Sequence, residues 1–205
     1  TTTTYHVMPG DGSTTVAGVT MSNQTCGGSY SGASQVMFLS DTDSCNTASD
    51  VMVDTGSINL TAVLSPAYSA ATTVTGQASG NSFQYWNTDN KNASFDVALG
   101  YITSGSFTAL GTAQTISLPC TATPDFSSNT GSVPAGSALA VQFTSSAFQV
   151  QIDFGNPDAY FYVNEVSGGG STSAPPDTHT VRADSGTSLD VEKGTTFSLT
   201  ATCDD

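Results

Sequence analysis

The fold class is decided by residues 134–163, which read PAGSALAVQFTSSAFQVQIDFGNPDAYFYV. Large apolar side chains occupy alternate positions over 139–143 and again over 148–154, with alanine, amide or carboxylate side chains between them. A period of two predicts strands with one face in a core and the other in water. Residues 155–158, Gly-Asn-Pro-Asp, are typical of a turn, and residues 160–163 are aromatic or β-branched. The stretch therefore predicts three consecutive strands in a β-meander.

The rest of the chain repeats short apolar alternations between turns rich in Gly, Pro, Asn and Asp. The clearest lies at residues 95–101, where Phe, Val, Leu and Tyr occupy every second position. No window shows the period of 3.6 that an amphipathic helix requires. Many short strands between such turns predict an all-β protein without substantial helix, built as a β-sandwich with jelly-roll or Ig-like wiring.

The sequence divides into four segments. Residues 1–8 are an extended, β-prone segment that ends at the turn signal Pro9-Gly10-Asp11-Gly12. We expect the main sandwich over 9–166, a flexible Gly/Ser/Pro linker over 167–177, and short strands over 178–205. Because a piece as short as the last segment cannot bury a core alone, we expect it to pack on the main sandwich.

The chain is acidic and has very few basic residues. Lys+Arg total 3 against Asp+Glu 17, a net charge of −14, although only 10% of residues are charged. Phosphate backbones and anionic membrane surfaces would be repelled, so we expect no nucleic-acid partner. No signal peptide and no apolar run of membrane-spanning length occurs, so we expect no membrane insertion and a mature secreted chain whose leader has been removed. These features predict an extracellular or cell-surface protein.

The four cysteines are widely spaced and form no C-x-x-C pair. An even number of such cysteines in a polar chain predicts two disulfides formed in an oxidising compartment. Three pairings are possible, and we favour Cys26 with Cys45 and Cys120 with Cys203. The alternative is that the four are free, buried thiols.

No catalytic constellation stands out in the sequence. The only histidines, His6 and His179, lie near opposite ends of the chain, and no G-x-S-x-G elbow occurs, which disfavours a serine hydrolase and a zinc site. The only glutamates, Glu165 and Glu192, have no spacing that indicates a catalytic carboxylate pair. We therefore predict that the protein is not an enzyme, and a secreted hydrolase is the third of three alternatives.

Acidic side chains gather at residues 41–50, DTDSCNTASD. Asp41, Asp43 and Asp50 are candidate calcium ligands, because calcium takes oxygen ligands from such loops. The order departs from the EF-hand pattern, since Cys45 stands at the third ligand position. We predict no cofactor beyond this candidate calcium ion, and the alternative is a solvated loop.

Two features concern carbohydrate. Trp86 is the only tryptophan and follows Tyr85 in a predicted strand, where adjacent side chains face opposite ways, so that one of the two points outward. The alternative is that Trp86 is a core residue. Three sequons begin at Asn23, Asn59 and Asn92, which are glycan acceptors where the producing cell has the machinery. Glycans are therefore candidate partners.

Three segments carry a family resemblance: FDVALGYITSGSFTALG at 95–111, TISLP at 115–119 and SVPAGSALAVQF at 132–143. Together they resemble a β-sandwich module that recurs in exported archaeal and bacterial surface proteins, among them cell-surface and filament subunits. The resemblance covers roughly half of the chain and implies architecture and location. It carries no catalytic residues.

Residues 1–8 are similar to the donated strand of pilins and thread-like filaments, in which one subunit completes the sheet of the next. The leading hypothesis is thus a non-enzymatic structural subunit that forms a homopolymer by donor-strand complementation. The alternatives are that residues 1–8 are the first strand of their own sheet, and that the protein is a secreted carbohydrate-binding or adhesion module. The residues that we assign to polymerisation are Thr3, Tyr5 and Val7 on the donated strand and Leu139, Val141, Phe148 and Val150 in the accepting core.

Overall fold

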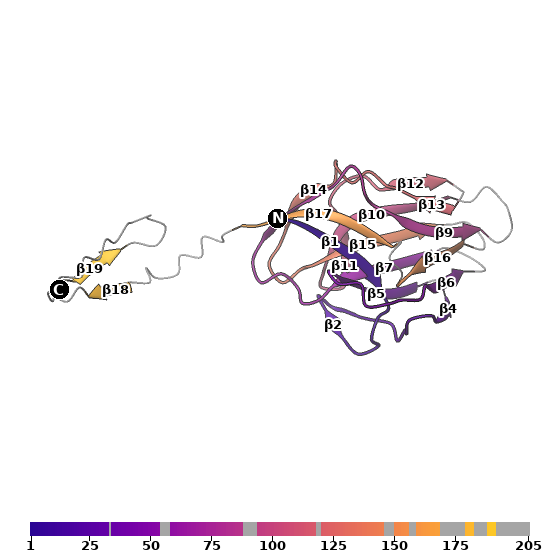
Figure 1. Cartoon of the computed structure of the whole chain (residues 1–205), viewed down its shortest axis with the longest axis horizontal. Helices are drawn as coiled ribbons and strands as arrows, with labels where there is room; N and C mark the ends of the chain where they lie inside the picture. The colour runs from indigo at the N-terminus through magenta and orange to yellow at the C-terminus, as the bar shows by residue number, and fades with distance from the viewer. Residues whose placement is uncertain are drawn as a thin grey trace, which may run out of the picture. The chain divides into compact units, whose positions relative to one another are not determined.

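The protein is all-β. The computed structural model describes residues 1–32, 34–53, 58–87, 94–117, 120–145, 150–155, 159–168, 179–182 and 188–191, and every regular element in these ranges is a strand (Figure 1). No helix in these ranges is long and apolar enough to cross a membrane. The chain forms two compact units, Thr1–Gly169 and Gly170–Asp205, whose boundary falls inside the predicted 167–177 linker.

The first unit contains seventeen of the strands. They are β1 (Thr2–Met8), β2 (Thr15–Val16), β3 (Val19–Thr20), β4 (Ser29–Ser31), β5 (Ser34–Ser40), β6 (Ser49–Val53), β7 (Ile58–Leu64), β8 (Thr72–Gly76), β9 (Phe83–Asn87), β10 (Ser94–Thr103), β11 (Ser106–Ala109), β12 (Gln114–Ser117), β13 (Cys120–Ala122), β14 (Thr130–Val133), β15 (Ala138–Ser145), β16 (Val150–Phe154) and β17 (Tyr160–Ser167).

A ten-stranded sheet forms most of this unit, in the order β11-β10-β15-β7-β5-β1-β17-β8-β14, with β12 pairing with β10. It curls strongly, so that it resembles half of a barrel more than one flat layer of a clear sandwich (Figure 1). A five-stranded sheet, β13-β9-β16-β6-β4, is the second layer. Two neighbouring pairs, β5 with β7 and β4 with β6, run parallel, and the other pairs are antiparallel.

The three strands expected over residues 139–163 are present, but the predicted meander is wrong. β15 lies between β10 and β7, β16 lies between β9 and β6 in the smaller sheet, and β17 lies between β1 and β8. Apolar alternation determines which face of a strand is buried, but it does not determine which strand lies beside it. All three strands therefore pair with segments that are distant in the sequence.

The main core lies between the two sheets and is rich in phenylalanine. The ring of Phe83 on β9 lies 5.1 Å from that of Phe143 on β15 and 6.3 Å from that of Phe161 on β17, measured between centroids. Phe126 packs edge-on against Phe161 at 6.1 Å. All four side chains are at most 1% exposed, so aromatic contacts join the smaller sheet to the larger one.

A second apolar cluster covers part of the opposite face of the large sheet. Val16 and Met21, from the β2–β3 hairpin and its end, pack with Ile102, Ala138 and other buried residues of the sheet. The hairpin turns at Ala17 and Gly18, both with positive φ, as a two-residue type I′ turn requires. A Cβ on Gly18 would lie 2.6 Å from the backbone nitrogen of Gly105, so this close contact needs glycine.

The second unit contains an antiparallel pair, β18 (His179–Arg182) and β19 (Ser188–Val191), in which His179 faces Val191. Both strands lie within residues 178–205, where short strands were expected. Packing of this segment on the main unit stays a prediction.

Candidate functional site

β1 occupies an interior position of the large sheet, between β17 and β5 (Figure 1). It pairs antiparallel with β17 from Thr2, opposite Asn164, to His6, opposite Tyr160. On its other side Val7 faces Leu39 of β5. We call the space between β5 and β17 the strand slot. Without β1, two strand edges inside the sheet would have no partner.

The side chains of β1 alternate between the core and the outer face of the sheet. Tyr5 is 6% exposed and Val7 is 1% exposed, and the Tyr5 ring lies 6.0 Å from that of Phe161 in the main core. Thr4 and His6 point the other way and are half-buried, with the His6 ring 5.8 Å from that of Tyr160. β1 is therefore an integral part of the core in this structure.

The carboxylate of Glu165 on β17 accepts hydrogen bonds from hydroxyl groups of β1 and of the segment after β7. Tyr5 donates to its Oε1 at 3.0 Å, Tyr68 donates to the same oxygen, and Thr3 donates to its Oε2 at 3.1 Å. Burial, and then the charge and hydrogen bond of Glu165, raise the pKa of the Tyr5 phenol; burial, and then the hydrogen bond and charge of Glu165, raise the pKa of Tyr68. Both phenols therefore stay protonated donors, and we call these four residues the carboxylate lock.

The chain is anchored immediately after β1. The backbone nitrogen of Gly10 donates to Oε1 of Gln24 at 3.0 Å, and Gln24 donates its own backbone N–H to the Gly10 carbonyl at 2.9 Å. A Cβ on Gly10 would lie 2.5 Å from the carbonyl oxygen of Ser22, so only glycine fits. Pro9 is therefore the joint between β1 and the rest of the described fold.

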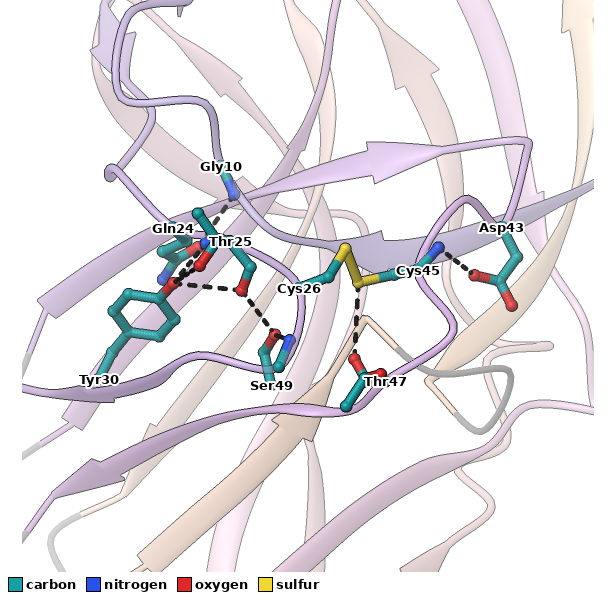
Figure 2. Close-up of a disulfide and its surroundings, with 10 residues drawn as sticks. Gly10, Gln24, Thr25, Cys26, Tyr30, Asp43, Cys45, Thr47 and Ser49 are labelled. Carbon is teal, nitrogen blue, oxygen red and sulfur yellow. Dashed lines mark hydrogen bonds between the residues drawn. A yellow bond between two sulfur atoms is a disulfide. The ribbon is translucent and has the colours of Figure 1, made fainter.

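A disulfide between Cys26 and Cys45 lies close to this joint (Figure 2). It is the pair that the sequence favoured. The Gly155 backbone packs against both the disulfide and Pro9, since a Cβ on Gly155 would lie 3.0 Å from Sγ of Cys45 and 3.3 Å from Cδ of Pro9. The disulfide thus braces the place where β1 ends. Cys120 lies in β13 and Cys203 lies outside the described residues, so the second pairing stays a prediction.

Hydrogen bonds hold the segments that the disulfide joins (Figure 2). The Ser49 hydroxyl donates to the Thr25 carbonyl at 3.0 Å and accepts from the Gly27 backbone nitrogen at 3.0 Å. The Tyr30 hydroxyl lies 3.2 Å from the same Thr25 carbonyl and accepts from the Thr25 backbone nitrogen. The segment around Cys26 is therefore fixed to the start of β6 by hydroxyl groups as well as by the disulfide.

The residues expected to accept a donated strand lie in the same core but not beside β1. Leu139 and Val141 are fully buried in β15, which β7 and β5 separate from β1. Val150 begins β16 in the smaller sheet, and Phe148 lies outside the described residues. The strands that pair with β1 are β5 and β17, and the sequence predicted neither as its partner. Glu165 was expected to have a role only in the hydrolase alternative, because nothing near Glu165 in the sequence indicates Tyr5 as its partner.

The three candidate calcium ligands are not brought together. Asp41 accepts from the Thr42 hydroxyl and Asp43 accepts from the Cys45 backbone nitrogen, both at 3.1 Å. Asp50 lies in β6 opposite Asp153 of β16, and burial, followed by the hydrogen bond and charge of Asp153, raises the pKa of Asp50. Within the described residues no three His, Cys, Asp or Glu side chains are grouped to hold a metal ion.

The candidate carbohydrate features are scattered. Asn23 and Asn59 are exposed, while Asn92 and the side chains of Tyr85 and Trp86 lie outside what the structure describes. Asn59 borders a groove of about 220 Å³ on the outer face of the large sheet, and the groove has an uncharged lining. Its polar and aromatic lining residues include Thr61, Gln142 and Phe107.

The chain matches no protein-family model and no curated protein sequence.

Proposed function

We propose that the protein is a non-enzymatic structural subunit of an extracellular filament or surface assembly. In this proposal each copy places its β1 in the strand slot of a neighbouring copy. The observation that supports it most directly is the position of β1, which continues into the following strands through Pro9 and fills an interior position of the sheet. Exchange of such an element between identical copies preserves its contacts and changes only the joint.

The energetics favour a slot that is always filled. Each fully buried large apolar side chain contributes about 1.5–3 kcal/mol, and β1 supplies Tyr5, Val7 and Met8 to buried positions. An empty slot would also expose two unpaired strand edges, which are sites for uncontrolled association. A neighbour's β1 is the occupant that fits with the same backbone pairing and the same side chains.

The architecture and location belong to the same proposal. We assign the unit to the β-sandwiches, with jelly-roll or Ig-like wiring, on the support of a phenylalanine core shared by two sheets. The Cys26–Cys45 disulfide supports an oxidising, extracellular compartment. The scarcity of Lys and Arg disfavours a nucleic-acid partner.

An engineered disulfide tests where β1 binds. Thr2 and Asn164 face each other across β1 and β17, and the Thr2 hydroxyl donates to Oδ1 of Asn164 at 2.6 Å. In oxidised Thr2→Cys/Asn164→Cys material, donation between copies gives a covalent ladder on a non-reducing denaturing gel. A matched control is Thr75→Cys/Thr130→Cys, which joins β8 to β14 within one copy and gives no ladder. If both variants gave crosslinked monomers and no ladder, strand donation would be refuted.

The uncharged groove favours a second candidate, a secreted carbohydrate-binding module. In the groove Gln142 donates to the Thr61 hydroxyl at 3.4 Å, and Phe107 packs over Gly100, where a Cβ would lie 2.6 Å from the ring. Amide and hydroxyl groups beside an aromatic ring suit a neutral sugar. Titration with methyl glucoside, methyl mannoside and N-acetylglucosamine, followed by NMR with Gln142→Leu as the control, tests this candidate. Absence of shifts at the groove would eliminate it.

A further inference from the structure

The carboxylate lock divides into a half that belongs to the slot and a half that β1 brings. Glu165 lies on β17, and Tyr68 lies in the segment after β7. Tyr68 is held without help from β1, because its backbone nitrogen donates to the Ser137 carbonyl at 2.9 Å and its carbonyl accepts from Gly136 at 2.8 Å. Thr3 and Tyr5 arrive with β1. The slot therefore presents a carboxylate and one phenol before the strand is added.

From this division we infer that Glu165 is the specificity-determining residue of the strand slot, and that the slot selects a second copy of this chain by the hydroxyl groups of Thr3 and Tyr5. The inference rests on the proposed strand donation. A strand with the same apolar pattern but without these hydroxyls would fill the core while leaving Glu165 short of two donors. Leaving a partly buried carboxylate without its donors costs more than a hydrogen bond gains, so selection is against the wrong strand.

The spacing of the two hydroxyls sets the register. Thr3 reaches Oε2 and Tyr5 reaches Oε1, so positions two apart on one face of β1 meet the two oxygens of one carboxylate. A slip of one residue would place Thr4 or His6 at the position of Tyr5, and a slip of two would place Thr3 or Val7 there, so none of these shifted registers puts a phenol at this position. The Glu165 carboxylate thus favours a strand that brings a phenol at position 5, in the register observed.

A peptide-binding experiment on the full chain tests the inference. The probe is a fluorescent peptide of residues 1–10, TTTTYHVMPG, added during assembly, and its Tyr5→Phe and Thr3→Val forms are compared by anisotropy. We expect the unmodified peptide to bind about ten- to a hundredfold more tightly than the Tyr5→Phe peptide, and about tenfold more tightly than the Thr3→Val peptide. On a Glu165→Gln chain the preference for Tyr5 should fall to within about threefold, whereas a Tyr101→Phe chain should keep it.

The outcomes distinguish a failure of the inference about Glu165 from a failure of the proposed strand donation. Equal binding of all three peptides to the unmodified chain would overturn the role of Glu165 while leaving strand donation intact. Because that result needs no altered chain, it stands even where Glu165→Gln fails to fold. No binding of any peptide, together with crosslinked monomers from Thr2→Cys/Asn164→Cys, would overturn strand donation and the inference with it.

Discussion

Two carboxyl sites join neighbouring strands in this molecule, and they are stabilised in opposite ways. Glu165, in the carboxylate lock, accepts hydrogen bonds from three hydroxyl groups. Asp50 instead faces another carboxyl group, Asp153, across β6 and β16, and its pKa is raised. With only three Lys and Arg in 205 residues, the chain has few cations to pair with its carboxylates. The difference shows two arrangements without a salt bridge: hydroxyl donors around one carboxylate, and a facing carboxyl pair in which Asp50 binds its proton more tightly than an isolated aspartate does.

Truncation of the Tyr5 side chain on β1 should have the largest effect on stability. Tyr5→Ala removes a core aromatic side chain and one donor to Glu165, and we expect it to lower the free energy of unfolding by about 3–5 kcal/mol. Urea unfolding of the full chain measures this. The control is Thr4→Ala, on the outer face of the same strand, which should cost less than about 1 kcal/mol. Similar losses for both variants would show that β1 contributes through backbone pairing alone.

Removal of the Glu165 charge should have the next largest effect on stability. Glu165→Gln keeps an oxygen acceptor but removes the anion, and hydrogen bonds to charged groups contribute about 1.5–3 kcal/mol. We therefore expect urea unfolding at pH 7 to show a loss of about 2 kcal/mol. If stability were unchanged or increased, the hydroxyl donors would not stabilise the Glu165 carboxylate. The contrast between Glu165 and Asp50 would then disappear.

The sequence predicts the strands of this fold far better than their neighbours. Alternation of apolar residues is a local signal, so it located β10, β15 and β17 and placed Tyr5 and Val7 on one face of β1. Pairing is non-local: Tyr5 and Glu165 are 160 positions apart, and Asp50 meets Asp153 from another part of the chain. No spacing in the sequence indicates either contact. Both contacts depend on how strands that are distant in the sequence are arranged in the folded chain.

Alkaline titration should distinguish the two sites by pH. The raised pKa values of Tyr5 and Tyr68 mean that the folded state keeps phenol protons that the unfolded chain loses near pH 10. Stability should therefore fall as pH rises above about 10, by at most about 1.4 kcal/mol per pH unit for each phenol. Urea midpoints between pH 8 and 11.5 measure this, and Tyr5→Phe should reduce the slope. An equal slope in Tyr5→Phe would contradict the assignment.

Removal of the Asp50 charge should raise stability, whereas removal of the Glu165 charge should lower it. In the folded chain Asp50 faces Asp153, with Gln151 and Ser29 as the neighbouring polar groups, and its pKa lies above the unfolded value near 3.9. The folded state thus binds the proton more tightly, so the stability from this site is complete below pH 4 and is lost as pH rises through the folded pKa.

Asp50→Asn removes this loss because an amide cannot ionise. Like charges directly opposite on paired strands cost up to about 1 kcal/mol, so we expect a gain of about 0.5 kcal/mol at pH 7 and none at pH 3. Asp41→Asn changes the net charge equally from an exposed position and is the matched control for long-range repulsion. An equal gain from both variants would attribute the effect to the acidity of the whole chain. A gain confined to Asp50→Asn and to neutral pH would attribute it to repulsion between Asp50 and Asp153, and would show that a facing carboxyl pair loses stability on ionisation, unlike a carboxylate that hydroxyl donors surround.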